Sequence, residues 1–233
     1  MLKARNVHGR FWLANLVQPC WFVEGKDNKI MLLEINPQNP QLRLIQQVTE
    51  ALRSGAVICY PTDSGYGMGC DLFNPKAIRR IAQIKKRPAQ KPFTFLCSSL
   101  KNISEYAHVS NTAYRLMKKC LPGPYTFVLP GTKLVPKAMA SKQKTVGIRV
   151  PADPICQLLL TALDNPLVNT SMPIMEGAAP LFDPYDVDLA FGKLVDLVID
   201  GGPMWPNRSS MIDLTGDAPV ILREGQGDTT LFR

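Results

Sequence analysis

The sequence predicts one α/β domain with a large, twisted, mixed sheet and flanking helices. Segments with helical spacing of apolar residues alternate with short apolar runs, which is the pattern of an α/β fold. The length of 233 residues suits a single large domain, and no repeat or low-complexity linker divides the chain. The domain is expected to span residues 31–227, between an extension (1–30) and a short tail (228–233).

The first 30 residues superficially imitate a signal peptide. The apolar run FWLANLVQPCWFV follows three cations, but Gln18 and Pro19 interrupt it and no small-residue cleavage site comes after it. We therefore expect a poorly ordered extension rather than an export signal. An alternative is that Met31 is the first residue of the natural protein.

The first predicted helix covers residues 41–55 (QLRLIQQVTEALRSG), because its apolar residues recur at helical spacing and Gly55 is a good stop signal. The next run, AVICYP, is apolar and ends at a proline, as expected of a buried strand. A second helix is expected to begin with Asn74 as the cap and Pro75 at its first position. Its single apolar stripe extends to Ile84.

The rest of the chain continues the same alternation. Short apolar runs bounded by turn residues predict strands, and the last two of them form a hairpin around a Thr-Gly-Asp-Ala turn. The expected strands are 92–97, 125–130, 145–151, 166–171, 195–200, 209–214 and 219–224, and the expected helices are 111–120, after Ser110, and 153–163. The proline- and glycine-bearing segment 175–186 (MEGAAPLFDPYD) is expected to be a mobile loop.

The composition argues against a membrane protein and against a metal-binding protein. Apolar residues make up 45% of the chain, but no run of about 18 apolar residues exists, so we expect a soluble protein without a membrane span. The six cysteines form no C-x-x-C pair and there are only two histidines, so no metal site is predicted. Cysteines within apolar runs are typical of buried thiols and of a reducing cytoplasm.

The net charge of +8 favours polyanionic partners such as nucleotides or RNA. A basic soluble enzyme without any nucleic-acid role would have the same composition. No G-x-x-x-x-G-K-[ST] or G-x-G-x-x-G motif is present, so side chains rather than a glycine-rich loop would have to hold a nucleotide.

The loop PTDSGYG, residues 61–67, is the first candidate for a site. It follows a buried strand and offers the hydroxyls of Thr62 and Ser64, the carboxylate of Asp63 and the phenol of Tyr66. Its glycines allow close approach of the backbone to a ligand. The same residues would also make an ordinary well-formed turn.

Four cations in the segment IKKRPAQKPFTF form the second candidate. Lys85, Lys86 and Arg87 lie at a helix C-terminus, where cations complement the helix dipole, and Lys86 is expected at the surface. Lys91 lies beyond Pro88, where no dipole requires it. A guanidinium and two ammonium groups that converge are suited to a triphosphate.

Arg149 and Arg223 are arginines within otherwise apolar strands. If buried, each needs an anionic partner, which could be a carboxylate or a bound phosphate.

In this order, the motifs YPTDSGYGMGCD, KKRPAQKP, PGPYTF, VGIRVP, VDLVIDGG and SSMIDLTGDAPVILREG resemble the YrdC/YciO-like family of threonylcarbamoyl-AMP synthases, most closely its YciO branch. The resemblance runs from Met31 to about Gly227 and is highly specific. It implies a YrdC-like twisted α/β sheet around a concave, positively charged cavity. It also implies that L-threonine, bicarbonate and ATP give threonylcarbamoyl-AMP and pyrophosphate, the first step toward a modified adenosine in tRNA.

The resemblance also implies the residues of the site. Lys85 and Arg87 match the family's K-x-R pattern, and together with Ser171 they form the expected catalytic set. ATP would bind as a substrate with Mg²⁺ shielding its triphosphate. The expected contacts to substrates and ATP are Thr62, Ser64, Tyr66, Lys91, Arg149, Ser209 and Arg223.

One position departs from the family pattern. Where synthases read S-T-S-A-N, this chain reads NTSMP, so Pro173 replaces an asparagine and removes a contact worth about 1 kcal/mol or more. Synthase activity is therefore expected to be weak. One alternative is a non-catalytic protein that binds tRNA or double-stranded RNA through the same basic cavity, and another is a related carbamoylation with a different acceptor.

Overall fold

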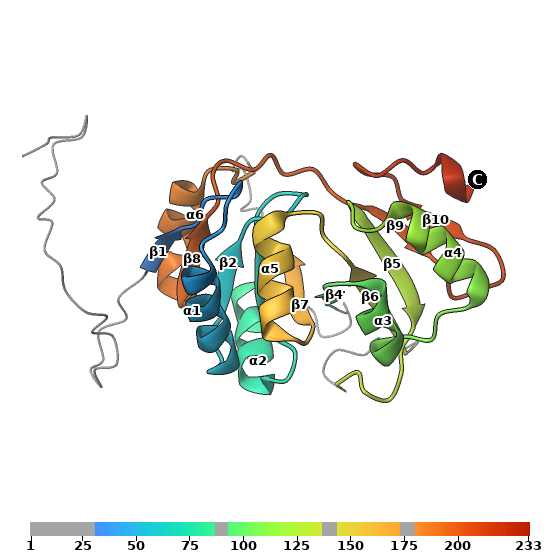
Figure 1. Cartoon of the computed structure of the whole chain (residues 1–233), viewed down its shortest axis with the longest axis horizontal. Coiled ribbons are helices and arrows are strands. Elements are labelled where there is room, and N and C mark those ends of the chain that lie inside the picture. The colour runs from blue at the N-terminus through green and yellow to red at the C-terminus, as the bar shows by residue number, and fades with distance from the viewer. Residues whose placement is uncertain (1–30, 87–92, 137–143, 173–179) are drawn as a thin grey trace, which may run out of the picture.

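The computed structural model describes residues 31–86, 93–136, 144–172 and 180–233, which form one large mixed sheet with helices packed against it (Figure 1). The order of the strands across the sheet is β1-β8-β2-β3-β7-β4-β6-β5-β9-β10, with both parallel and antiparallel pairs. The single α/β domain with a mixed sheet is thus confirmed. The strands are β1 (Met31–Glu34), β2 (Ile58–Tyr60), β3 (Gly67–Asp71), β4 (Thr94–Leu96), β5 (Tyr125–Pro130), β6 (Thr145–Arg149), β7 (Leu167–Ser171), β8 (Leu197–Asp200), β9 (Ser210–Asp213) and β10 (Val220–Arg223).

Helices α2 and α4 begin where the capping signals predict. The Asn74 side chain accepts a hydrogen bond from the Ala77 amide, and the Ser110 hydroxyl does the same for Ala113. The helices within the described ranges are α1 (Leu42–Arg53), α2 (Pro75–Ile84), α3 (Leu100–Tyr106), α4 (Asn111–Cys120), α5 (Pro154–Leu163) and α6 (Pro184–Phe191), with the short 3-10 helices η1 (Gly192–Leu194) and η2 (Thr230–Phe232).

Two hydrophobic cores lie on opposite faces of the sheet. The first core lies between the sheet and helices α1 and α5, and the second core lies on the other face. Side chains along β2 and the residue before it alternate between them: Ile58 and Tyr60 lie in the first core, and Val57 and Cys59 lie in the second. The second core receives α2, α3, α4 and α6. Because both faces of β2 are covered, this strand reads as a continuous apolar run in the sequence.

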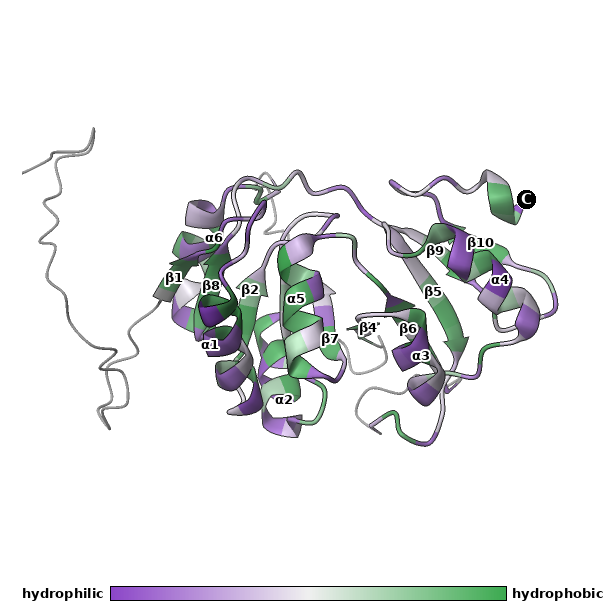
Figure 2. Ribbon diagram, in the orientation of Figure 1, coloured by the Kyte–Doolittle hydropathy of each residue, from purple (hydrophilic) through white to green (hydrophobic). Residues whose placement is uncertain are grey.

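Helix α5 lies against both the sheet and α1 (Figure 1). Figure 2 shows α5 as mostly hydrophobic, whereas α1 and α3 carry hydrophilic residues. Ile155, Leu159 and Leu163 of α5 are buried in the core that this helix shares with α1. The strongly apolar composition of α5 therefore follows from its contacts with two neighbours at once.

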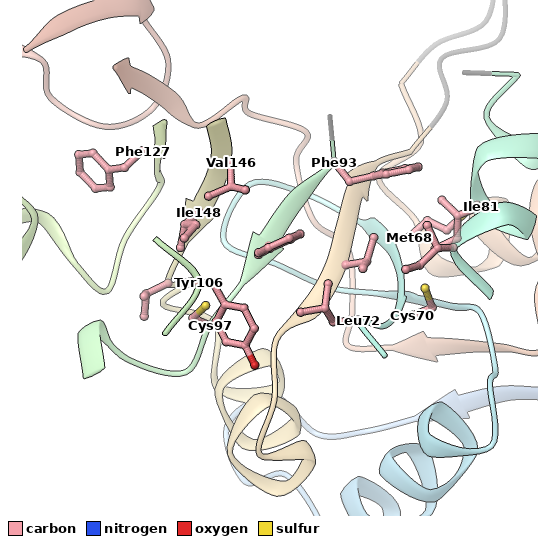
Figure 3. Packing of buried hydrophobic residues seen from close by; sticks show 14 of the residues in the cluster. Met68, Cys70, Leu72, Ile81, Phe93, Cys97, Tyr106, Phe127, Val146 and Ile148 are labelled. Atoms are coloured by element: carbon pink, nitrogen blue, oxygen red, sulfur yellow. The ribbon is translucent and has the colours of Figure 1, made fainter. Parts of the chain in front are cut away.

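The second core runs along the length of the sheet, and Figure 3 shows its central part. Phe95 and Tyr106 meet edge to face with ring centroids 6.2 Å apart. Cys70 and Cys97 lie among these apolar side chains, and burial raises the pKa of each thiol to about 12. These cysteines behave as small hydrophobic residues, as their positions in apolar runs predict.

Strand β3 was not predicted, because its sequence GMGCD resembles a continuation of the glycine-rich loop before it. The glycines of β3 instead allow the adjacent strands to pack closely against it. A Cβ on Gly67 would lie 2.7 Å from Oδ1 of Asn169, and one on Gly69 would lie 2.9 Å from the ring of Tyr60. Glycine is therefore required here because residues of the adjacent strands approach closely, although glycine has a low propensity for strands.

The prediction of a loop over 175–186 is wrong at its C-terminal end. The Asp183 side chain accepts a hydrogen bond from the Tyr185 amide, and α6 begins at Pro184. This is the same combination of cap and proline that identifies α2, but here the helix is short and its amphipathic pattern weak. Helix α3 and strand β1 were also not predicted, since both are short.

The C-terminal end of the chain joins the second core. Phe232 of η2 is only 4% exposed and packs against the rings of Tyr125 and Phe127. Residues 1–30 lie outside the part of the chain that the structure describes. Within the described part, none of the helices has the length and hydropathy needed to span a bilayer.

Candidate functional site

A cavity of about 710 Å³ opens over the strands that α1 and α5 leave uncovered. Leu96 of β4 packs in the core of α1 and α5, and Thr94, two residues earlier on the same face of the strand, lines the cavity. Thr126 of β5 and Met211 of β9 extend the lining across the sheet. A cavity of this volume is typical of a site for a small molecule.

The cavity brings together every sequence-predicted site residue that the structure describes. These residues come from loops and strands far apart in the chain. They are Thr62, Ser64, Tyr66, Lys85, Arg149, Ser171, Ser209 and Arg223. Three further positions of the prediction, Arg87, Lys91 and Pro173, lie outside the described residues.

Arg149, at the end of β6, is 4% exposed and is held by the loop between β2 and β3. Its guanidinium forms an ion pair with the Asp63 carboxylate and donates a 2.6 Å hydrogen bond to the Ser64 hydroxyl. The other oxygen of Asp63 accepts the backbone N–H of Ala152 at 3.1 Å. The anionic partner that a buried arginine requires is therefore a carboxylate from a distant loop.

One of the three nitrogens of the Arg149 guanidinium is unsatisfied within the described part of the chain. Its Nε is buried and has no hydrogen-bond partner among the described residues. A buried donor without a partner loses about 1–3 kcal/mol relative to a satisfied one. Arg149 lines the cavity, but this buried N–H is not accessible from it.

Arg208 and Arg223 add two more guanidinium groups to the cavity wall. Nε and NH2 of Arg223 both donate to the carbonyl oxygen of Ser209, at 3.0 and 2.8 Å. The pKa of Arg223 is lowered, first by partial burial and then by the charges of Arg208 and Arg149. Within the described part of the chain, no carboxylate forms an ion pair with Arg208 or Arg223.

Lys85, at the C-terminal end of α2, bridges to β7. Its Nζ donates a 2.7 Å hydrogen bond to the carbonyl oxygen of Ser171, and both residues line the cavity. The neighbouring Lys86 is exposed, as predicted. The structure thus separates a cavity lysine from a surface lysine within the cluster.

The hydroxyls of Thr62 and Tyr66 form hydrogen bonds within the protein. Thr62 donates to the carbonyl of Gly65 at 2.6 Å, and Tyr66 donates to the carbonyl of Gly202 at 2.9 Å. Burial raises the pKa of the Tyr66 phenol, so it stays protonated at neutral pH. Both residues line the cavity, and their bonds fix the shape of the loop that holds Arg149.

Asp153 lies just behind this loop as the cap of α5. It is 6% exposed and accepts a 2.8 Å hydrogen bond from the amide of Cys156. Burial, with help from the charge of Asp63, raises its pKa from 3.8 to about 6. A second carboxylate next to Asp63 is therefore easily neutralised.

Sequence reasoning missed Arg208 and Asn169 as site residues. Asn169 lies two residues before Ser171 on β7, so strand periodicity could have placed both on one face. Its side chain accepts a 2.6 Å hydrogen bond from Tyr60. Arg208 precedes Ser209 directly in a segment without regular structure, and no pattern identifies it.

The described lining is strongly cationic. Lys85, Arg208 and Arg223 contribute positive charge, whereas the charge of Arg149 is compensated by Asp63, and none of the described lining residues is Asp or Glu. Nor do any three His, Cys, Asp or Glu side chains within the described ranges come together as a metal site. The arrangement is suited to bind an anion with several oxygens by direct hydrogen bonds from guanidinium groups.

Comparisons with known proteins by family model, by sequence and by structure agree on one family. The Sua5/YciO/YrdC family model, described as "Telomere recombination", matches residues 50–225. The uncharacterized protein YciO of Escherichia coli (strain K12) is 46% identical over 199 residues, which are 85% of this chain and 97% of that protein. The crystal structure of E. coli YciO has a TM-score of 0.82 at 45% identity and covers 87% of this chain and 99% of that one.

Proteins with an assigned activity are more distant. A threonylcarbamoyl-AMP synthase of Coxiella burnetii (strain RSA 493 / Nine Mile phase I) is 34% identical over 165 residues, which are 70% of this chain and 88% of that protein. The crystal structure of Pyrococcus abyssi Sua5 complexed with L-threonine has a TM-score of 0.78 at 29% identity. It covers 84% of this chain and 57% of that one.

The ion pair of Arg149 and Asp63 is expected to stabilise the domain more than an exposed pair does. Asp63→Asn leaves a buried guanidinium without its counter-charge, which lowers the free energy of unfolding by about 3 kcal/mol. Glu224→Gln is the control, because Glu224 pairs with Arg233 where both side chains are 63% exposed, and the expected loss is below about 1 kcal/mol. Equal losses in urea denaturation would contradict this difference.

Asp153 is expected to make the domain less stable as pH rises from about 4 to 6. The folded protein retains the Asp153 proton up to about pH 6, whereas the unfolded chain releases it near 3.8, so the folded state binds more protons in this interval. Asp153→Asn keeps the capping oxygen but cannot ionise. Relative to the wild type, the variant should gain up to about 3 kcal/mol between pH 4 and pH 7 in denaturation experiments. A difference between the two proteins that stays constant with pH would refute the assignment.

Proposed function

Because the chain belongs to the Sua5/YciO/YrdC family, we propose that it acts as an L-threonylcarbamoyladenylate synthase. In this reaction L-threonine, bicarbonate and ATP give threonylcarbamoyl-AMP and pyrophosphate. The observation that carries the proposal is the cavity over β4, β5 and β9, whose lining includes Arg208 and Arg223, neither of which forms an ion pair with a described carboxylate. The Sua5 structure with L-threonine supports threonine as the amino acid.

All three substrates carry anionic groups at neutral pH, although threonine as a whole is a zwitterion. The ammonium group of threonine first releases a proton, and the resulting amine attacks the carbon of bicarbonate, from which water leaves to give a carbamate. A carbamate oxygen then attacks the α-phosphorus of ATP, and the bond from that phosphorus to the oxygen bridging the α- and β-phosphates breaks, which releases pyrophosphate. Cations fixed in place favour both steps, because they hold the anions together and stabilise charge on the departing pyrophosphate.

The structure supports distinct roles for the cationic residues. Arg208 and Arg223 would bind phosphate oxygens directly, since neither is neutralised by a described carboxylate. Arg149 would hold the loop between β2 and β3 in place, because Asp63 and Ser64 of this loop bind its guanidinium. The planar guanidinium groups of Arg208 and Arg223 suit phosphate oxygens better than flexible ammonium groups do.

Lys85 would hold the end of β7 where Ser171 lies, and Arg87 would complete the K-x-R pair. Mg²⁺ would enter with ATP, bound to triphosphate oxygens and water, because the described residues offer no carboxylate cluster for it. Pro173 cannot supply the amide of the asparagine typical of family synthases, so we propose a slow enzyme.

The direct test is release of pyrophosphate from ATP by the purified protein. We expect release only when both threonine and bicarbonate are present. Arg223→Ala should lower the rate by about 10-fold to 100-fold, because a hydrogen bond from a charged group is worth about 1.5–3 kcal/mol. Arg233→Ala removes an exposed arginine outside the cavity and should leave the rate within about twofold. No release that depends on threonine and bicarbonate would refute the proposal.

Binding of tRNA or double-stranded RNA is a second candidate, favoured by the net charge of +8. If about four phosphates are contacted, the affinity should fall about 100-fold between 50 and 200 mM salt. Arg208→Ala should weaken binding at the lower salt concentration, because Arg208 is exposed at the cavity wall. A filter-binding assay measures both effects. No detectable binding at 50 mM salt would dismiss this candidate.

A further inference from the structure

Trp205 presents an exposed aromatic ring on the segment that lines the cavity from Pro206 onward. Its ring stacks on that of Phe182 with centroids 4.8 Å apart and planes at 7°, yet 72% of the residue remains exposed. Each ring is adjacent in sequence to a lining residue, because Pro206 follows Trp205 and Leu181 precedes Phe182. One ring face is thus covered by Phe182, which leaves the opposite face for a ligand.

The segment that carries Trp205 is anchored on both sides. The amide of Met204 donates a 2.8 Å hydrogen bond to the carbonyl of Phe182, which joins the two chain segments beneath the stacked rings. Pro206 lies so close to Gly65 that a Cβ added there would be 2.9 Å from the proline Cα. The indole orientation is therefore set before any ligand arrives, which lowers the entropy lost on binding.

Cationic groups follow directly along the same segment. Arg208, three residues after Trp205, lines the cavity with Arg223, and its charge contributes to the lowered pKa of Arg223. An exposed aromatic ring three residues before an arginine of the cavity wall matches a ligand that joins a planar, apolar ring to phosphates. Nucleotides have this combination, and base stacking on a tryptophan tolerates any base.

We infer that the exposed face of Trp205 is the stacking platform for the base of a nucleoside phosphate whose phosphates lie against Arg208 and Arg223. This inference rests on the proposed function and adds the position of the base. Phe182 is a positioning residue, since it supports the indole from the side that the ligand does not reach.

Fluorescence tests this assignment, because the other tryptophans of the chain are Trp12 and Trp21. In a Trp12→Phe/Trp21→Phe protein, Trp205 is the sole indole reporter. AMP and ATP should quench its emission on binding, whereas pyrophosphate and ribose 5-phosphate, which lack a base, should bind without quenching. Quenching by a single-stranded RNA but not by AMP or ATP would overturn the inference in favour of an RNA base.

Affinity provides the second readout, by calorimetry of full-length protein. Trp205→Ala should weaken ATP binding at least about fivefold and leave the affinity for pyrophosphate within twofold, while Trp205→Phe should retain most of the ATP affinity. Unchanged ATP affinity in Trp205→Ala would overturn the platform and leave the proposed synthase standing. Absence of ATP binding to the wild-type protein would overturn both.

Discussion

The buried ion pair between Arg149 and Asp63 is the interaction on which the candidate site depends. It joins the end of β6 to the loop between β2 and β3, and this loop also supplies Thr62, Ser64 and Tyr66 to the cavity wall. A buried guanidinium without a counter-charge would destabilise the fold, so the loop and the strand must stay together. The pair neutralises Arg149 as a net charge but leaves its Nε without a protein partner. The same contact therefore holds together the wall that carries Thr62, Ser64 and Tyr66.

The cavity exists because the sheet is wider than the helix layer on one of its faces. Helices α1 and α5 cover the strands near β2, and the face continues past them over β4, β5 and β9. Small and polar residues replace the buried apolar ones there. Gly147 of β6 is an example, since a Cβ at this position would lie 3.3 Å from the Thr94 hydroxyl and 3.5 Å from a Thr126 methyl group. The uncovered half of the face thus becomes a polar floor beneath the arginines.

Local signals predicted most of the fold, and distant contacts decided the rest. The Asn74 cap with Pro75 predicts α2 because the capping bond is made within three residues. Strand β3 was not recognised, because its glycines are selected by Asn169 and Tyr60, which lie on neighbouring strands. Likewise the sequence shows that Arg149 needs an anion if buried, but a carboxylate 86 residues away in the chain cannot be identified from local pattern. Arg208 has no local signal at all, since only the folded chain places it beside Arg223.

The arginines Arg208 and Arg223 of this cavity are proposed to bind the phosphates of ATP. A crystal structure of the protein with a non-hydrolysable ATP analogue and L-threonine tests this role most directly. Phosphate oxygens should lie within hydrogen-bond distance of Arg208 or Arg223, with the Arg149 and Asp63 pair intact. An analogue bound outside the cavity, or bound inside it with both of these guanidinium groups turned away from the phosphates, would contradict this role.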